Sequence, residues 1–169
     1  MARYYNISGE LTQELLAAGN GVTVDSISLV NIHASTPCSI DLYIEKNLTG
    51  KFYVEKSKVL SVGTSVTLKD IKFNNKIGEF GLYVKLGKPN VFTLTGTIDP
   101  AASATVTGVN TLFLSEVAIG DEIIVTGETR TVTAIASNTS LTVSVAFSNN
   151  SNDATPDCSP KPNVDVIIN

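Results

Sequence analysis

The tetrapeptide Lys-Pro-Asn-Val occurs twice in this chain, as Lys88–Val91 and as Lys161–Val164. The stretch between the two copies differs in composition from the residues outside it. A short repeat at both ends of a distinct stretch indicates a domain inserted into another domain. We therefore expect a host made of residues 1–90 plus 164–169 and an insert made of residues 91–163.

Excision of the insert would join Gly81–Asn90 directly to Val164–Asn169, which gives one strand, one turn and one more strand. The host then gains its missing final strand. The alternative is a plain tandem arrangement, in which the last strand belongs to the second unit.

Charge is divided unevenly between the two parts. Residues 1–91 carry 10 Lys+Arg and 8 Asp+Glu, whereas residues 92–163 carry 2 and 7. The lysines of the first part are balanced by nearby acids and lack an array of stacking aromatics, so nucleic acid is not expected as a partner. A membrane is not expected either, because no apolar run approaches the roughly 20 residues that cross a bilayer.

Most of the chain alternates between apolar and polar residues with a period of two, which places successive side chains on opposite faces of a sheet. Clear examples are Ile40–Glu45, Leu82–Leu86 and Val164–Ile168. We expect an all-β fold: a small antiparallel β-sandwich of the jelly-roll kind for the host, carrying a small β-barrel domain.

One helix is predicted in the host, over Ser8–Ala18. Ser8 is a suitable cap, and Leu11, Leu15 and Ala18 fall on one side of such a helix. An extended first strand packed through Leu11 and Leu15 is the alternative.

The insert is predicted to contain about five strands, including a three-stranded meander. Gly127-Glu128 is the expected two-residue hairpin loop, because Gly tolerates the positive φ that such a loop requires. Ser137–Ser140 is expected to form the next turn. The expected strands are Phe92–Thr97, Ala104–Thr107, Glu122–Thr126, Thr129–Ile135 and Leu141–Phe147.

Two cysteines, Cys38 and Cys158, are too few and too far apart for a disulfide framework or a zinc site. We expect two free thiols, with a single bridge between host and insert as the alternative.

No catalytic constellation is present in the sequence. His33 is the only histidine and has no partnered Cys or Ser in a recognisable motif, so we expect it to be structural. The densest carboxylates, Glu116, Asp121, Glu122 and Glu128, border a tight turn where solvated carboxylates are common. We predict a non-enzymatic protein without a cofactor or a metal site.

Two parts of the chain resemble proteins of tailed bacteriophages. Gly120–Val143, preceded by Ala104–Phe113, resembles a small β-module of virion proteins that include tail fibres and decoration-type proteins. The host looks like the small β-sandwich of phage structural proteins, through Ile27–His33, Ile40–Glu45, Val62–Leu68 and a closing strand such as Val164–Ile168.

The resemblance implies a virion structural protein that decorates or cements the capsid surface. Its expected partners are other virion proteins, the major capsid protein first, and further copies of the chain, with a trimer as one arrangement. The alternative is a receptor- or carbohydrate-binding module of the tail, neck or fibre, with a host surface glycan as ligand. For that alternative, Phe113 and Phe147 beside polar loops of the insert would supply a stacking face.

The predicted partner-binding residues are Arg3, Tyr4 and Tyr5. We expect them on an N-terminal arm next to unpaired strand edges of the sandwich, where they would dock onto a neighbouring subunit by strand addition. Tyrosine at such a position offers contact area and a hydrogen bond at modest entropy cost. A frayed terminus is the alternative. The acidic insert would then project outward.

Overall fold

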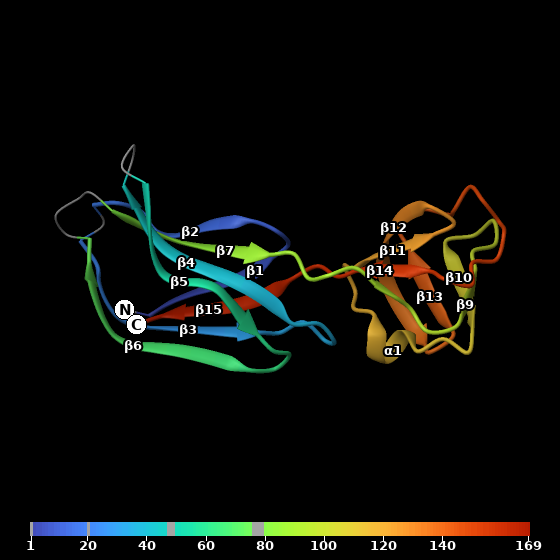
Figure 1. Ribbon diagram of the computed structural model, residues 1–169, viewed down its shortest axis with the longest axis horizontal. Coiled ribbons are helices and arrows are strands. Elements are labelled where there is room, and N and C mark those ends of the chain that lie inside the picture. The colour runs from blue at the N-terminus through green and yellow to red at the C-terminus, as the bar shows by residue number, and fades with distance from the viewer. Residues whose placement is uncertain (1, 20, 47–49, 76–79) are drawn as a thin grey trace. The chain divides into compact units, whose positions relative to one another are not determined.

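The computed structural model describes residues 2–19, 21–46, 50–75 and 80–169. The chain divides into two compact units (Figure 1). Unit 1 comprises Met1–His33, Pro37–Lys88 and Pro162–Asn169, and unit 2 comprises Ala34–Thr36 and Pro89–Lys161. Residues 34–36, which the sequence placed in the host, thus group with unit 2. Each unit is built from antiparallel strands around a core of its own.

Unit 1 consists of two four-stranded sheets, as far as the described residues go. One has the order β1-β15-β3-β6 and the other the order β2-β7-β4-β5. The strands are β1 (Arg3–Ser8), β2 (Thr12–Leu16), β3 (Thr23–Asn31), β4 (Cys38–Lys46), β5 (Gly50–Leu60), β6 (Ser65–Asn74), β7 (Gly81–Gly87) and β15 (Asn163–Ile168).

The strand pairs of unit 1 are nested. β1 pairs with β15, β2 with β7, β3 with β6 and β4 with β5, all antiparallel. The first strand of the unit therefore pairs with the last, the second with the next to last, and so on inward. A long folded hairpin rolled into two sheets in this way is a jelly roll. The expected all-β sandwich of the jelly-roll kind is confirmed.

The last strand, β15, lies inside a sheet between β1 and β3. Its alternate residues Val164, Val166 and Ile168 are almost completely buried, and burial of each such side chain stabilises the fold by about 1.5–3 kcal/mol. The sequence suggested a direct strand–turn–strand connection from β7 to β15, but the two strands belong to different sheets. The chain changes sheet between them because in a jelly roll the last two strands lie in opposite layers.

The core of unit 1 fills the space between the two sheets. It consists of the inward-facing residues of both layers, each at most 3% exposed: Ile7, Leu15, Leu16, Val24, Ile27, Leu29, Cys38, Ile40, Leu42, Leu60, Leu82, Val84, Leu86, Val164, Val166 and Ile168.

The helix predicted over Ser8–Ala18 is absent. The extended alternative is right about conformation but not about packing, because the segment is divided between two strands and only Leu15 of the two named leucines is buried. Residues 3–8 form β1 and residues 12–16 form β2. Leu11, the first residue of the proposed apolar face, is 57% exposed, whereas Leu15 and Leu16 are both buried. Tertiary pairing with β15 and β7 overrides the helical spacing of the leucines.

Unit 2 contains one curled sheet among its described residues, with the order β8-β14-β11-β12-β13-β10-β9. The two outermost strands, β8 and β9, are separated in the chain by only residues 94–96, so the sheet must close on itself. Closure is completed by a bridge between Ile98 and Asp153 and by a hydrogen bond from Leu94 N–H to Pro156 O of 2.7 Å. The result is the small barrel expected for the insert.

The strands of unit 2 are more numerous than the five expected, and most of them are short. They are β8 (Phe92–Thr93), β9 (Thr97–Asp99), β10 (Thr105–Val109), β11 (Glu122–Val125), β12 (Glu128–Ser137), β13 (Ser140–Val143) and β14 (Asp157–Ser159), with a single-turn helix α1 (Phe113–Glu116). Short strands suit a tightly curved barrel.

The β11–β12 hairpin turns one residue earlier than predicted. Val125 pairs with Glu128, so the loop is Thr126-Gly127 and not Gly127-Glu128. Both loop residues have positive φ, 51° for Thr126 and 83° for Gly127, as a type I′ turn requires. The Thr126 N–H donates to Asp153 Oδ2 over 2.6 Å, which helps to hold a conformation that threonine seldom adopts.

Candidate functional site

The predicted partner-binding residues lie on β1, which is an edge strand of its sheet. They are part of the folded sheet and not a separate arm, because Arg3, Tyr4 and Tyr5 pair with Ile168, Ile167 and Val166. Tyr4 is 72% exposed, whereas Tyr5 is half-buried and donates its hydroxyl to Leu15 O. The strand therefore combines one anchored tyrosine with one exposed tyrosine.

The backbone of β1 presents hydrogen-bonding groups on its open side. Gly9 N–H donates to Pro162 O over 2.8 Å, which identifies Gly9–Pro162 as a hydrogen-bonded pair next to the β1–β15 ladder. In an antiparallel ladder such pairs alternate along the strand, so the odd-numbered residues of β1 bond to β15. The N–H and C=O groups of Tyr4, Asn6 and Ser8 then point away from β15, where β1 has no neighbouring strand among the described residues.

The other three edge strands of unit 1 are irregular. β2 has a register shift between Glu14 and Leu16, and β5 has two register shifts against β4 and a positive φ at Ser57. β6 has positive φ at Asp70 and Lys72. Bulges and twists of this kind prevent another strand from pairing along an edge. β1 pairs with β15 in continuous register from Arg3 to Ser8 and lacks these interruptions.

Charge protects two of these three edges, β5 and β6, as well. Lysines occupy β5 at positions 51, 56 and 58 and β6 at positions 69 and 72, and all five are exposed. Lysine on an edge strand discourages pairing with another chain. β1 carries a single charge, Arg3, at its beginning. Among the four edges, β1 is the one that its sequence and geometry leave open to strand addition.

A shallow hollow of about 240 Å³ lies beside this edge. It is lined by Tyr4, Tyr5, Asn6, Asp165, Val166 and Ile167, all from β1 and β15. Asn6 Nδ2 donates to Asp165 Oδ1 over 2.8 Å and fixes the polar end of the hollow. The exposed ring of Tyr4 stands at its other end, next to Ile167 in the ladder.

A second feature, not foreseen from the sequence, is a row of side chains across the sheet β2-β7-β4-β5. Glu14, Tyr83, Tyr43 and Tyr53 are successive partners on the four strands and face away from the core. The Tyr43 ring stacks on Tyr83 at 5.6 Å and is tilted against Tyr53 at 5.7 Å. Tyr83 donates its hydroxyl to Glu14 Oε1 over 3.1 Å.

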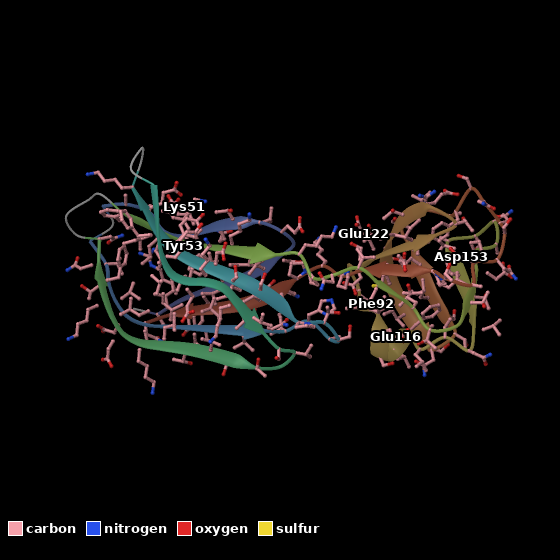
Figure 2. The ribbon with its side chains drawn as sticks, in the orientation of Figure 1. Lys51, Tyr53, Phe92, Glu116, Glu122 and Asp153 are labelled. Atoms are coloured by element: carbon pink, nitrogen blue, oxygen red, sulfur yellow. The ribbon has the colours of Figure 1, made fainter. Side chains whose placement is uncertain are left out.

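Lysines cover this tyrosine row. Lys51 Nζ lies 4.4 Å from the centre of the Tyr43 ring and donates to its hydroxyl over 3.2 Å, while Lys56 Nζ lies 5.0 Å from the centre of the Tyr53 ring. Figure 2 places Lys51 and Tyr53 on the same strand, β5. The bond to Tyr43 raises the pKa of the Lys51 ammonium. Burial, and then the bond to Glu14, raise the pKa of Tyr83.

The carboxylates of unit 2 that the sequence grouped together are used to hold loops. Glu116 accepts from Thr95 N–H and Oγ1, at 3.0 and 2.5 Å. Asp121 is 1% exposed and accepts from the N–H groups of Ala118 and Lys161, each at 2.8 Å. The four carboxylates are therefore not assembled into one site.

The carboxylate of Glu128 accepts from Ser148 N–H at 3.0 Å and from Asn149 N–H at 2.8 Å. Both bonds lower the pKa of the Glu128 carboxyl, the bond from Ser148 having the larger effect. Glu122 lies on β11, across the hairpin from Glu128. Within the described residues, no group of three His, Cys, Asp or Glu side chains is placed to hold a metal ion.

The stacking face expected on unit 2 is not present. Phe113 and Phe147 are 0% and 3% exposed and belong to the core of the unit, so neither ring can meet a sugar. Their apolar character, and not a binding role, explains their position. His33 is also buried, at 5% exposure.

Both cysteines are free and buried thiols, Cys38 in the core of unit 1 and Cys158 in the core of unit 2. The alternative of a bridge between them is therefore wrong.

In the described part of the chain, no helix has the length and apolar character that a membrane span requires.

Comparison of the chain with protein-family models, curated proteins and solved structures found no match.

Proposed function

We propose that the chain is a non-enzymatic structural protein of a tailed-phage virion, which decorates or cements the capsid surface by adding its β1 edge to a neighbouring subunit. The observation that carries this proposal is the contrast between β1 and the other edges of unit 1. Three edges have bulges or lysines that oppose pairing, and β1 has neither.

The jelly-roll arrangement of unit 1 supports the proposal. This fold recurs in viral capsid proteins as well as in lectins and cupins, so the fold alone does not select a function. The open edge offers a means of attachment that the fold alone does not show. Strand addition supplies affinity through main-chain hydrogen bonds and requires no catalytic residue. Tyr4 and the neighbouring hollow provide side-chain contacts beside those bonds.

Location of the chain in the particle tests this proposal. Purified particles of the phage that encodes the chain should contain it in many copies, with density on the capsid surface in cryo-EM reconstructions. Particles that lack the chain should recruit the purified full-length protein in a saturable manner. Absence of the chain from purified virions, or density confined to the tail, would overturn the capsid role.

A second function, a receptor- or carbohydrate-binding module of the tail, neck or fibre, is favoured by the tyrosine row. Tyr53 is 44% exposed beside Lys56, and the row continues through Tyr43, which Lys51 covers, to Tyr83 and Glu14. Such a row of aromatic and charged groups suits a polar ligand with apolar faces. Binding of the full-length chain to a glycan array that is lost in Tyr53→Ala and retained in Tyr4→Ala would favour this function over capsid decoration.

A further inference from the structure

The open side of β1 is matched in register to a second copy of itself. The groups that point outward belong to the even-numbered residues Tyr4, Asn6 and Ser8. In an antiparallel pair of identical strands, outward groups must meet outward groups, so the two residue numbers of each facing pair add up to an even number. The twofold axis must therefore lie at a residue position, where one residue faces the same residue of the second copy. It cannot lie midway between two successive residues.

Of the allowed registers, the one centred on Asn6 uses the edge fully. It pairs Tyr4 with Ser8 of the second copy, Asn6 with Asn6, and Ser8 with Tyr4, so that all three outward residues bond. A register centred on Tyr5 would pair Tyr4 with Asn6 and leave Ser8 opposite Ala2, outside the strand. The Asn6 register therefore makes the larger number of main-chain bonds.

Charge favours the same register. Arg3 would lie opposite Gly9 of the second copy and next to its exposed Glu10, and the twofold axis repeats this contact at the other end of the pair. No like charges face each other, because Arg3 is the only charged residue of β1. The edge is thus complementary to itself both in backbone pattern and in charge.

We propose that two copies of this chain pair through antiparallel β1 strands about a twofold axis at Asn6, which joins their sheets into one of the order β6-β3-β15-β1-β1-β15-β3-β6. This inference rests on the proposed function and names the neighbouring subunit at the β1 edge as a second copy. Its interface is isologous, the commonest kind in soluble homo-oligomers. The proposed homo-oligomer is a twofold pair, whereas the sequence suggested a trimer as one arrangement.

Light scattering coupled to size-exclusion chromatography measures the pairing directly. The full-length chain should reach twice its mass of 17.9 kDa as its concentration rises. Asn6→Pro removes the central outward N–H but no main-chain bond to β15, and should weaken the dimer by at least about 10-fold. Asn6→Ala is the matched control, because it removes the side-chain bond to Asp165 and keeps the N–H.

A charge exchange tests the register. Arg3→Glu should weaken the dimer, and Arg3→Glu combined with Glu10→Arg should restore it. Amide hydrogen exchange adds an independent readout: the amides of Tyr4, Asn6 and Ser8 should become protected as concentration rises, whereas those of Tyr5 and Ile7 should be protected throughout. This exchange also shows whether each variant is folded.

The outcomes separate the pairing from the virion function. A chain that stays monomeric, with fast exchange at Tyr4, Asn6 and Ser8, but still binds particles would overturn the pairing and leave the virion role intact. A β1-dependent dimer that never associates with particles would support the pairing and overturn the virion role. A trimer, or a dimer unaffected by Asn6→Pro, would also overturn the pairing.

Discussion

Tyr43 stacks on Tyr83 across two neighbouring strands, with ring centroids 5.6 Å apart and ring planes 16° apart. The pair lies on the face of its sheet that points away from the core, yet Tyr43 is only 1% exposed. Neighbouring side chains, Lys51 and Tyr53 among them, bury it from above. This face of the sandwich therefore has a small packed layer of its own.

We expect Tyr43→Ala to reduce the free energy of unfolding of unit 1 by about 3–5 kcal/mol, as for other large buried aromatics. Tyr43→Phe should cost only about 0.5–1.5 kcal/mol, because it keeps the stacking and loses the bond to Lys51. Urea unfolding followed by circular dichroism measures both. If Tyr43→Ala cost no more than Tyr53→Ala, whose parent side chain is 44% exposed, the layer would not be packed as described.

Gly96→Ala should destabilise unit 2 more than Gly127→Ala does. Both glycines have similar positive φ, 84° and 83°, so both substitutions carry a conformational cost of about 1–2 kcal/mol. At Gly127 an added Cβ meets open space, whereas at Gly96 it would lie 2.4 Å from Val109 O. Overpacking against backbone adds about 1–3 kcal/mol at Gly96 alone.

The two glycine variants form a matched pair for thermal unfolding of the full chain. The transition of unit 2 should fall further in Gly96→Ala, and the transition of unit 1 should not move in either variant. Equal effects of the two substitutions would mean that the β8–β9 corner can relax away from β10.

Strands with one face in the core were predictable from sequence. The alternation identifies β7 and β15, and β4 as far as Leu42, because every second residue is buried there. The nested pairing could not be read in this way, since it depends on which strands, many of them distant in the chain, become neighbours in a sheet. The tyrosine row was missed for the same reason: Tyr43, Tyr53 and Tyr83 come together only through the pairing of β5, β4 and β7.

Local signals failed where tertiary contacts decide the conformation. Leu11 and Leu15 have helical spacing, but pairing of β2 with β7 buries Leu15 and exposes Leu11. Thr126 adopts a positive φ that its type disfavours, with its N–H bonded to Asp153, a residue distant in the chain. The β1 edge was predictable in part, because Tyr4 and Tyr5 were identified from the sequence as partner-binding residues. Which N–H and C=O groups of β1 point outward could be deduced only from the pairing of β1 with β15.

Both thiols should react slowly in the folded protein. Burial raises the pKa of Cys38 to about 11 from 9.0. Burial, and then the carboxylate of Asp121, raise the pKa of Cys158 further. At about pH 8 the thiolate fraction of Cys38 is then about 100-fold below that of an ordinary thiol. Alkylation followed by mass spectrometry should show little labelling of either residue until denaturant is added. Rapid labelling of Cys158 in the native chain would show that the barrel opens readily.

Glu128 should make the stability of unit 2 sensitive to acid. Its pKa is lowered in the fold, first by the N–H of Ser148 and then by that of Asn149, so the ionised form stabilises the folded state. This contribution is present above the ordinary value of 4.5 and is lost as the pH falls through the lower folded value. Glu128→Gln should therefore be less stable than the parent chain at neutral pH, and the deficit should shrink towards about pH 3. Thermal unfolding across this range measures it, with Glu122→Gln as a control that removes the same charge from the same hairpin. A deficit that is equal at both ends of the range would show that the charge of Glu128 does not hold the loop at Ser148.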